Sequence, residues 1–122
     1  STVGANADGQ PYNVNADEAA RAIAVAMDAE KIVYLTAAPG LLEDVKDESS
    51  LVRRIGATEL RERIEHESVS AGMIPKLRAC ADAVDGGVRT AHIIDGRVPH
   101  ALLIELLTDE GIGTMVKREA DW

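Results

Sequence analysis

Three polar side chains suited to chemistry lie where a Gly/Asn-rich loop gives way to a helix near the N-terminus. Asn13, Asn15 and Asp17 alternate along residues 12–20, and Glu18 follows. Asn15 is predicted to be the N-cap, because its side chain can accept from free amides of the first turn, and Glu18 completes a capping-box pattern. Asn13 has no part in that cap. Asp17 takes the second helical position, where its carboxylate either interacts with the helix dipole or faces a ligand.

A second polar group, Lys76, follows a loop of small residues at 68–72 and lies in the first turn of a predicted helix. Pro75 fits that turn, where its missing N–H costs nothing. Free amides at a helix start with a lysine one turn inside can bind a phosphate group. The glycine spacing and the Lys-Ser/Thr pair of a P-loop are absent, so a surface lysine near a helix start explains the pattern equally well.

Residues 37–40, Ala-Ala-Pro-Gly, form a predicted turn after the apolar run at 31–36, which is typical of a buried parallel strand. In open α/β sheets, ligands bind at the carboxyl ends of the strands. The turn at 37–40 is therefore expected near a site.

The elements that must position these groups follow from composition and periodicity. The 122 residues suffice for one domain, and 46% hydrophobic residues with 2% aromatic and no Phe indicate a core of small aliphatic side chains, as in α/β proteins. Strands are predicted at 2–5, 31–36, 51–55, 88–94 and 114–116, with a hairpin turn at 6–10, and helices at 16–29, 58–65, 75–85 and 101–107. Thr58 is a predicted cap, and His66 a C-terminal dipole partner. The almost wholly apolar helix at 101–107 is expected to be buried or to lie at an interface.

The net charge of −8 argues against nucleic-acid and anionic-membrane partners, although a local anion pocket stays compatible with it. Cys80 is the single cysteine, and no apolar run approaches the ~20 residues that span a bilayer. A cytoplasmic location is therefore expected. The start at Ser1 suggests part of a longer protein.

Four segments, taken together and in order, closely resemble the acetylglutamate kinase family. They are Tyr-Asn-Val-Asn-Ala-Asp at 12–17, Leu-Thr with Pro-Gly at 35–40, Gly-Met-Ile-Pro-Lys at 72–76, and His-Ile-Ile-Asp-Gly at 92–96 continuing to Gly-Thr at 113–114. The resemblance implies a three-layer αβα sandwich with a mainly parallel sheet, forming the C-terminal half of an amino-acid-kinase fold as a single domain, residues 1–122. It also implies ATP- and Mg²⁺-dependent phosphorylation of the side-chain carboxylate of N-acetyl-L-glutamate in arginine biosynthesis, by a homo-oligomer.

Site residues carry over by position in the matching motifs. Asn13 matches the asparagine that holds acetylglutamate, Asp17 the aspartate that organises the catalytic lysines, and Lys76 the lysine that stabilises the transferring phosphoryl group. The segments that surround ATP correspond to Thr36, Ala37, Pro39, Gly40 and Leu41 in the first loop, and to Ser68, Val69, Ser70 and Met73 in the second.

His100, Glu105 and Gly111 fall in a pattern that resembles the mark of arginine-inhibited members, which implies an L-arginine effector site. Leu107 stands where those members usually have Phe. Ala37 stands where the family usually has an aspartate, which implies weaker metal or ATP binding. The family's N-terminal half, with its glycine-rich phosphate loop, a second catalytic lysine and most acetylglutamate contacts, is not matched by these residues. The chain alone is therefore expected to turn over no substrate and to bind adenine nucleotide weakly.

The chemistry agrees with these implied roles. A glutamate-type carboxyl group has a pKa of about 4.3, so at neutral pH it is already an anionic nucleophile and needs no general base. The catalytic task is to bring two anions together and to spread the charge on the phosphoryl oxygens. Asp17 then acts by orienting the catalytic lysines and not by abstracting a proton. Two alternatives stay open: a carbamate, aspartate or uridylate kinase of the same fold, and a non-catalytic half-domain that acts in nucleotide binding, regulation or assembly.

Overall fold

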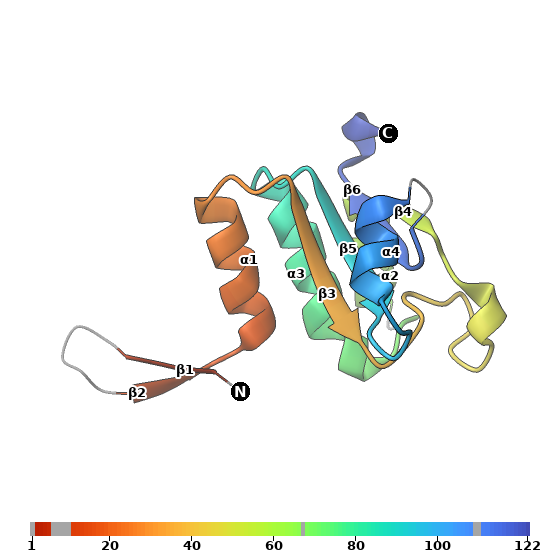
Figure 1. Ribbon diagram of the computed structural model, residues 1–122, viewed down its shortest axis with the longest axis horizontal. Helices are drawn as coiled ribbons and strands as arrows, with labels where there is room; N and C mark the ends of the chain where they lie inside the picture. The colour runs from red at the N-terminus through yellow and green to blue at the C-terminus, as the bar shows by residue number, and fades with distance from the viewer. Residues whose placement is uncertain (1, 6–10, 67, 109–110) are drawn as a thin grey trace.

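The computed structural model describes residues 2–5, 11–66, 68–108 and 111–122, with only the backbone described for 2–5 and 11–14 (Figure 1). The predicted hairpin turn at 6–10 lies outside the described residues. The elements are β1 (Thr2–Ala5), β2 (Pro11–Val14), α1 (Ala16–Ala26), β3 (Lys31–Thr36), β4 (Arg54–Gly56), α2 (Ala57–Glu65), α3 (Ile74–Asp85), β5 (Thr90–Asp95), α4 (Ala101–Leu107) and β6 (Thr114–Lys117). Short 3₁₀ turns occupy Glu48–Ser50, Ala71–Met73 and Glu119–Asp121.

The main sheet has four strands in the order β3-β5-β6-β4. β3 runs parallel to β5 over six register pairs from Lys31↔Thr90 to Thr36↔Asp95, and β4 runs parallel to β6. β5 and β6 are antiparallel. The mainly parallel sheet predicted from the sequence is therefore confirmed. A separate antiparallel pair, β1 and β2, extends from the start of α1 (Figure 1).

Alternation along β5 separates the two faces of the sheet. Ala91 and Ile93 belong to the apolar core formed with α1, α2 and α3, whereas His92, which must point to the opposite face, contacts α4 through Glu105. In Figure 1, α4 lies in front of the sheet and α3 behind it. The predicted three-layer arrangement is confirmed.

The core contains aliphatic side chains, as the composition predicted. The largest fully buried side chains are Leu60, Leu77, Ile93, Ile94, Val84, Val88, Val116, Thr114 and Cys80. Burial raises the pKa of the Cys80 thiol, which therefore stays protonated. Among the described residues, none of the helices has the length and apolar character that crossing a membrane requires.

Several predicted limits of helices and strands were wrong. α1 stops at Ala26, because Met27 is its C-cap and Asp28 takes a positive φ of 54°. Thr58 is not the N-cap of α2. Gly56 takes that position, and glycine has no side chain that could accept a hydrogen bond from the first turn. The strand predicted at 51–55 is shifted to Arg54–Gly56, where β6 offers a parallel partner.

Helix α4 has the predicted bounds, but burial is the wrong alternative for most of its apolar residues. Ala101 is buried, whereas Leu102, Leu103, Leu106 and Leu107 are 44%, 54%, 53% and 79% exposed. A single helix of this length covers only part of the second face of the sheet, so its outer side meets no other element of the described chain. The interface alternative stays a prediction.

Candidate functional site

Two helix starts converge at the carboxyl ends of β3 and β5. α1 leads into β3 and α3 leads into β5, so each helix begins near the edge where its strand ends. Figure 1 shows the first turns of α1 and α3 at the same end of the molecule as the arrowhead of β3. Helix N-termini present free N–H groups and a partial positive charge, which favours anions at this edge.

Asn15 caps α1, as predicted. Its Oδ1 accepts from the Asp17 N–H at 2.9 Å and from the Glu18 N–H at 3.3 Å. The Glu18 carboxylate instead accepts from Arg21 Nε at 3.0 Å, so the second half of the predicted capping box is not formed. Because Asn15 satisfies these amides, the Asp17 carboxylate is left for another partner.

That partner is Lys76. Its Nζ lies 3.2 Å from Asp17 Oδ2 and 3.5 Å from Oδ1, and the two side chains are 25% and 20% exposed. The Tyr34 hydroxyl donates to the Asp17 carbonyl oxygen at 2.7 Å and ties this turn to the sheet. Burial raises the pKa of Tyr34 well above its usual range, so the phenol stays a donor. The two groups predicted to be catalytic are thus in contact.

Asn13 lies in β2, where its backbone pairs with Val3. It precedes Asn15, the N-cap of α1, by two positions, so it is close to Asp17 in the sequence. Its side chain is outside the described part of the structure, and its substrate-binding role stays a prediction.

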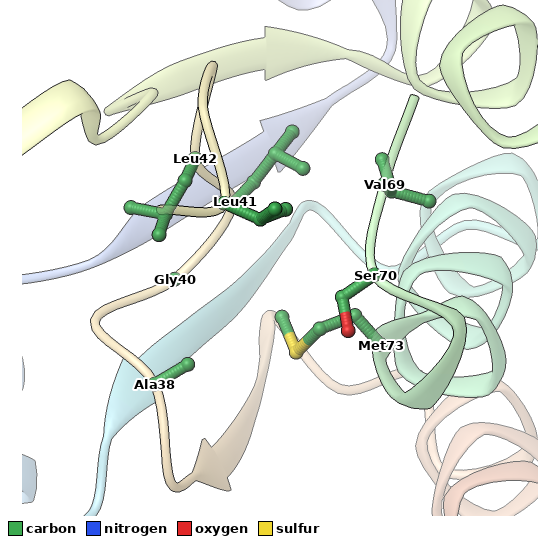
Figure 2. Close-up of a pocket in the computed structure, with 8 residues that line it drawn as sticks. Ala38, Gly40, Leu41, Leu42, Val69, Ser70 and Met73 are labelled. Carbon is green, nitrogen blue, oxygen red and sulfur yellow. The ribbon is translucent and has the colours of Figure 1, made fainter. Parts of the chain in front are cut away.

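An apolar cavity of about 170 Å³ lies between the loop that follows β3 and the loop that precedes α3, the helix that carries Lys76 (Figure 2). Its lining residues are Ala38, Gly40, Leu41, Leu42, Val45, Val69, Ser70 and Met73. Figure 2 shows the Met73 thioether and the Ser70 hydroxyl on one side, and Ala38, Leu41 and Leu42 on the other. The cavity is almost wholly aliphatic, which suits a flat apolar ring held by a few polar contacts.

The structure brings together five of the predicted nucleotide-binding residues in this cavity: Gly40, Leu41, Val69, Ser70 and Met73. Thr36 lies beside them, with Oγ1 at 3.8 Å from Met73 Sδ. The other predicted residues, Ala37, Pro39 and Ser68, are not among its lining. The Ser68 hydroxyl instead donates to the Arg63 carbonyl and helps to end α2.

Thr114 holds the first loop in place. Its hydroxyl accepts from the Leu41 N–H at 2.9 Å and donates to the Val52 carbonyl at 2.6 Å. Gly40 has φ 149°, and a Cβ there would lie 2.7 Å from Thr114 Oγ1. The loop can therefore approach β6 this closely only with glycine at position 40.

A second, polar cavity of about 150 Å³ lies on the α4 face of the sheet. Its lining includes Glu105 and Gly111, two of the three residues of the predicted effector pattern, and the cationic side chains of Lys31, Arg53 and Lys117. His100, the third, caps α4 with φ 59°, is exposed, and is not among the lining residues. The structure thus brings Glu105 and Gly111 together in this cavity, and the part of His100 in an effector site stays a prediction.

Sequence reasoning missed His92, which is 4% exposed inside the second cavity. Its Nδ1 lies 2.6 Å from Glu105 Oε1, and its Nε2 lies 2.9 Å from the Thr90 hydroxyl. The available signal was a polar residue inside an apolar strand, two positions after a threonine that shares its face. Leu42 and Val45 in the first cavity gave no such signal, whereas Ala38 belongs to the turn at 37–40 that was expected near a site.

The described side chains contain no group of three or more His, Cys, Asp or Glu residues placed to hold a metal ion. At the sheet edge, Asp95 is the acidic residue in register with Thr36. Its carboxylate accepts from Arg97 Nε and Nη2 at 2.9 Å each. Arg97 lowers the pKa of Asp95, so this carboxylate is ionised but committed to an internal partner.

Comparison with known proteins agrees with this geometry. A family model described as the amino acid kinase family matches residues 1–95. An acetylglutamate kinase of Symbiobacterium thermophilum is 54% identical over 114 residues, which are 93% of this chain and 39% of that protein. The chain thus spans about two fifths of the length of this curated relative.

Two solved structures are similar in fold. An N-acetylglutamate synthase from Neisseria gonorrhoeae, complexed with coenzyme A and L-arginine, superposes with a TM-score of 0.84 at 31% identity, over 96% of this chain and 26% of that one. A carbamate kinase from Giardia lamblia bound to AMP-PNP gives a TM-score of 0.69 at 17% identity, over 93% of this chain and 36% of that one. The second likeness concerns the fold alone.

Proposed function

The chain belongs to the amino acid kinase family, and from this we propose that it forms the nucleotide-binding half, a single domain over residues 1–122, of an enzyme that phosphorylates the side-chain carboxylate of N-acetyl-L-glutamate with ATP, in arginine biosynthesis. The high identity to an acetylglutamate kinase supports the choice of this substrate over the other substrates of the family. Because the match covers only 39% of that relative, the acetylglutamate contacts other than Asn13 would come from residues outside the match.

The observation that carries the proposal is that the start of α3 supplies both a wall of the apolar cavity, through Met73, and the cation of the Asp17–Lys76 pair. Met73 lines the cavity and is the N-cap of α3, and Lys76 lies three positions further on, within the first turn. An ATP molecule whose adenine ring lay between the two loops would therefore have its phosphates near Lys76 and the N-terminus of α3. Both favour the negative charge that builds on the transferring group.

The roles of the two residues follow from charge. The acceptor carboxylate, with a pKa near 4.3 in solution, is already ionised at neutral pH. Lys76 then reduces the repulsion between two anions and stabilises the phosphoryl oxygens, and Asp17 fixes the position of the ammonium group. ATP supplies the phosphoryl group. Mg²⁺ would be held chiefly by the phosphates of ATP, because the described side chains contain no group of three or more His, Cys, Asp or Glu residues placed to hold a metal ion and Ala37 replaces the usual aspartate.

We also assign an L-arginine effector site to the second cavity, where Glu105 and Gly111 lie together. The related N-acetylglutamate synthase was solved with L-arginine, which supports an amino-acid effector in this fold. The cavity holds three cationic side chains and one carboxylate, so it suits a ligand with separate anionic and cationic groups. His100, the exposed N-cap of α4, stays the third residue predicted for this site.

A homo-oligomer in the cytoplasm completes the proposal. The exposed leucines of α4 would be covered in an assembly, and Cys80 is buried and unpaired, as in a reducing compartment. Light scattering of the purified protein measures its mass directly, and a monomer at micromolar concentration would exclude self-association of functional strength.

Calorimetric titration of the 122-residue chain with ATP and with adenosine tests the nucleotide site. We expect weak binding of both, with ATP the tighter. Met73→Ala should weaken both ligands by about tenfold, because it removes apolar contact with the ring. Lys76→Ala should weaken ATP alone, by about tenfold, since it removes one charge-assisted contact to phosphate.

Met27→Ala and Lys46→Ala, which change exposed residues of the same types outside the site, are the controls and should bind as the wild type does. If Lys76→Ala weakened adenosine and ATP equally, the phosphate role of Lys76 would be wrong. Absence of any adenine-nucleotide binding by a folded chain would overturn the nucleotide-binding assignment.

A further inference from the structure

Arg63, in the last turn of α2, is bound to both of the loops that line the apolar cavity. Its guanidinium donates from Nη1 to Glu43 Oε2 at 3.1 Å and from Nη2 to Glu43 Oε1 at 3.0 Å. Its carbonyl oxygen accepts from the Ser68 N–H at 3.1 Å and from the Ser68 hydroxyl at 3.0 Å. Glu43 belongs to the loop after β3 and Ser68 to the loop before α3, so one residue joins the two segments that form the cavity walls.

Each of these contacts lies one position from a residue of the cavity wall. Leu42 precedes Glu43, Val69 follows Ser68, and both Leu42 and Val69 line the cavity. Figure 2 shows Leu42 and Val69 on the two facing loops. A planar peptide unit joins each anchored residue to its neighbour, so the contacts of Arg63 limit how far the two walls can separate.

The ion pair of Arg63 with Glu43 is partly exposed but has a defined geometry. The two side chains are 23% and 60% exposed. Two parallel N–H···O bonds fix the carboxylate relative to the guanidinium, which a single contact would not do. Hydrogen bonds from Arg63 lower the pKa of Glu43, so this carboxyl group is ionised at neutral pH. An exposed pair contributes little to global stability, and its effect is therefore expected in the position of the loop.

A second carboxylate on the same guanidinium provides an internal comparison. Arg63 Nη2 donates to Glu59 Oε1 at 3.0 Å, four positions earlier on α2. Glu59 is 56% exposed, close to the value for Glu43, and it is not among the residues that line the cavity or belong to its loops. Removing either carboxylate takes one partner from Arg63, but only Glu43 connects it to a cavity wall.

We propose that Arg63 is a positioning residue of the nucleotide cavity: its guanidinium holds the loop after β3 through Glu43, its carbonyl oxygen holds the loop before α3 through Ser68, and the two walls thereby keep the separation that an adenine ring fits. The inference rests on the nucleotide site proposed above. A merely structural ion pair would change the free energy of unfolding without changing the affinity for adenosine.

Calorimetric titration with adenosine, which is uncharged and forms no ion pair itself, tests the role in four variants: Arg63→Gln, Glu43→Gln, the double variant and Glu59→Gln. Arg63→Gln and Glu43→Gln should each weaken adenosine binding by about two- to fivefold, the range for an exposed ion pair. The double variant should bind no more weakly than Arg63→Gln, because both substitutions remove the same contact. Glu59→Gln should bind adenosine as the wild type does.

Salt gives a second readout on the same proteins. Raising NaCl from about 0.05 M to about 0.5 M screens an exposed ion pair. The adenosine affinity of the wild type should therefore fall toward that of Glu43→Gln, whose own affinity should change far less. Neither carboxylate is buried, so Glu43→Gln and Glu59→Gln are expected to fold, and urea unfolding checks this.

If Glu43→Gln bound adenosine as tightly as the wild type, or if salt affected both equally, the positioning role would be wrong and the nucleotide site would stand. Equal weakening by Glu59→Gln would reveal a general effect of charge on α2 and would also overturn it. A wild-type chain that binds neither adenosine nor ATP would overturn the nucleotide site and this inference with it.

Discussion

The ammonium group of Lys76 lies 3.2 Å from the carboxylate of Asp17, across 59 positions of the sequence. The contact joins the first turns of α3 and α1 at the edge where β3 ends. Two residues that local pattern explains equally well as surface groups thus form one charged unit, and Met73, at the start of the helix that carries Lys76, lines an apolar cavity.

Asp17→Asn tests what that unit does. The pair is partly exposed, so we expect the free energy of unfolding to change by less than about 1 kcal/mol. Asp17 competes with phosphate for Lys76, so ATP should bind to the variant at least as tightly as to the wild type. In an enzyme competent for catalysis, turnover should fall by about 10²-fold, because Lys76 is no longer oriented.

Urea unfolding, ATP titration and steady-state kinetics measure these three effects. Asp28→Asn, in the exposed turn just after the same helix, is the matched control. A large loss of ATP affinity in Asp17→Asn would contradict the orienting role.

The buried histidine gives a signed dependence of stability on pH. The pKa of His92 in the folded chain lies below its unfolded value of 6.5. Between these two values the unfolded chain binds more protons, so stability falls as the pH decreases from about 6.5 toward the folded pKa. We expect the free energy of unfolding to decrease between about pH 7 and about pH 5 by at most ~1.4 kcal/mol per pH unit from this one group.

Urea unfolding at several pH values measures the slope, and His92→Asn should lower it because asparagine does not titrate. The carboxylates contribute mainly below this range. Equal slopes in the wild type and His92→Asn would show that His92 titrates normally in the folded chain.

Gly111→Ala should weaken both the fold and the effector cavity. A Cβ at this position overlaps Glu105, and φ 65° is strained for alanine. We expect a loss of about 1–3 kcal/mol in the free energy of unfolding. Gly87→Ala is the matched control, since Gly87 also has a positive φ, of 112°, but open space around it. The additional loss in Gly111→Ala over Gly87→Ala, measured by urea unfolding, reports the contact with Glu105; equal losses would mean that the contact is relieved easily.

Glu119 should act as the cap of α2 from a distance. Its Oε1 accepts from the Thr58 N–H at 2.6 Å, which supplies the acceptor that Gly56 lacks. Glu119→Ala is expected to lower the free energy of unfolding, measured with urea, by about 0.5–2 kcal/mol, the usual cost of losing an N-cap. Glu62→Ala, an exposed glutamate on α2 itself, should change it far less. Similar effects of the two substitutions would refute a specific capping role.

The sequence by itself determined the elements and much of the site. Periodicity predicted the bounds of β3 and α4, and turn chemistry predicted Asn15 as the cap of α1, because these features depend on residues close in the chain. Composition predicted an aliphatic α/β core. Asp17 and Lys76 were chosen by resemblance to a family, since neither pattern excluded a surface role.

Only the tertiary structure decided which distant groups meet. Three contacts join residues from separate elements: Thr114 with the Leu41 N–H, Glu119 with the Thr58 N–H at the start of α2, and His92 with Glu105. Local pattern cannot show such contacts, because they depend on strand order and on which face each side chain takes. Likewise, only the structure shows that His100 is the exposed, left-handed N-cap of α4, while Glu105 is buried and contacts His92 on β5.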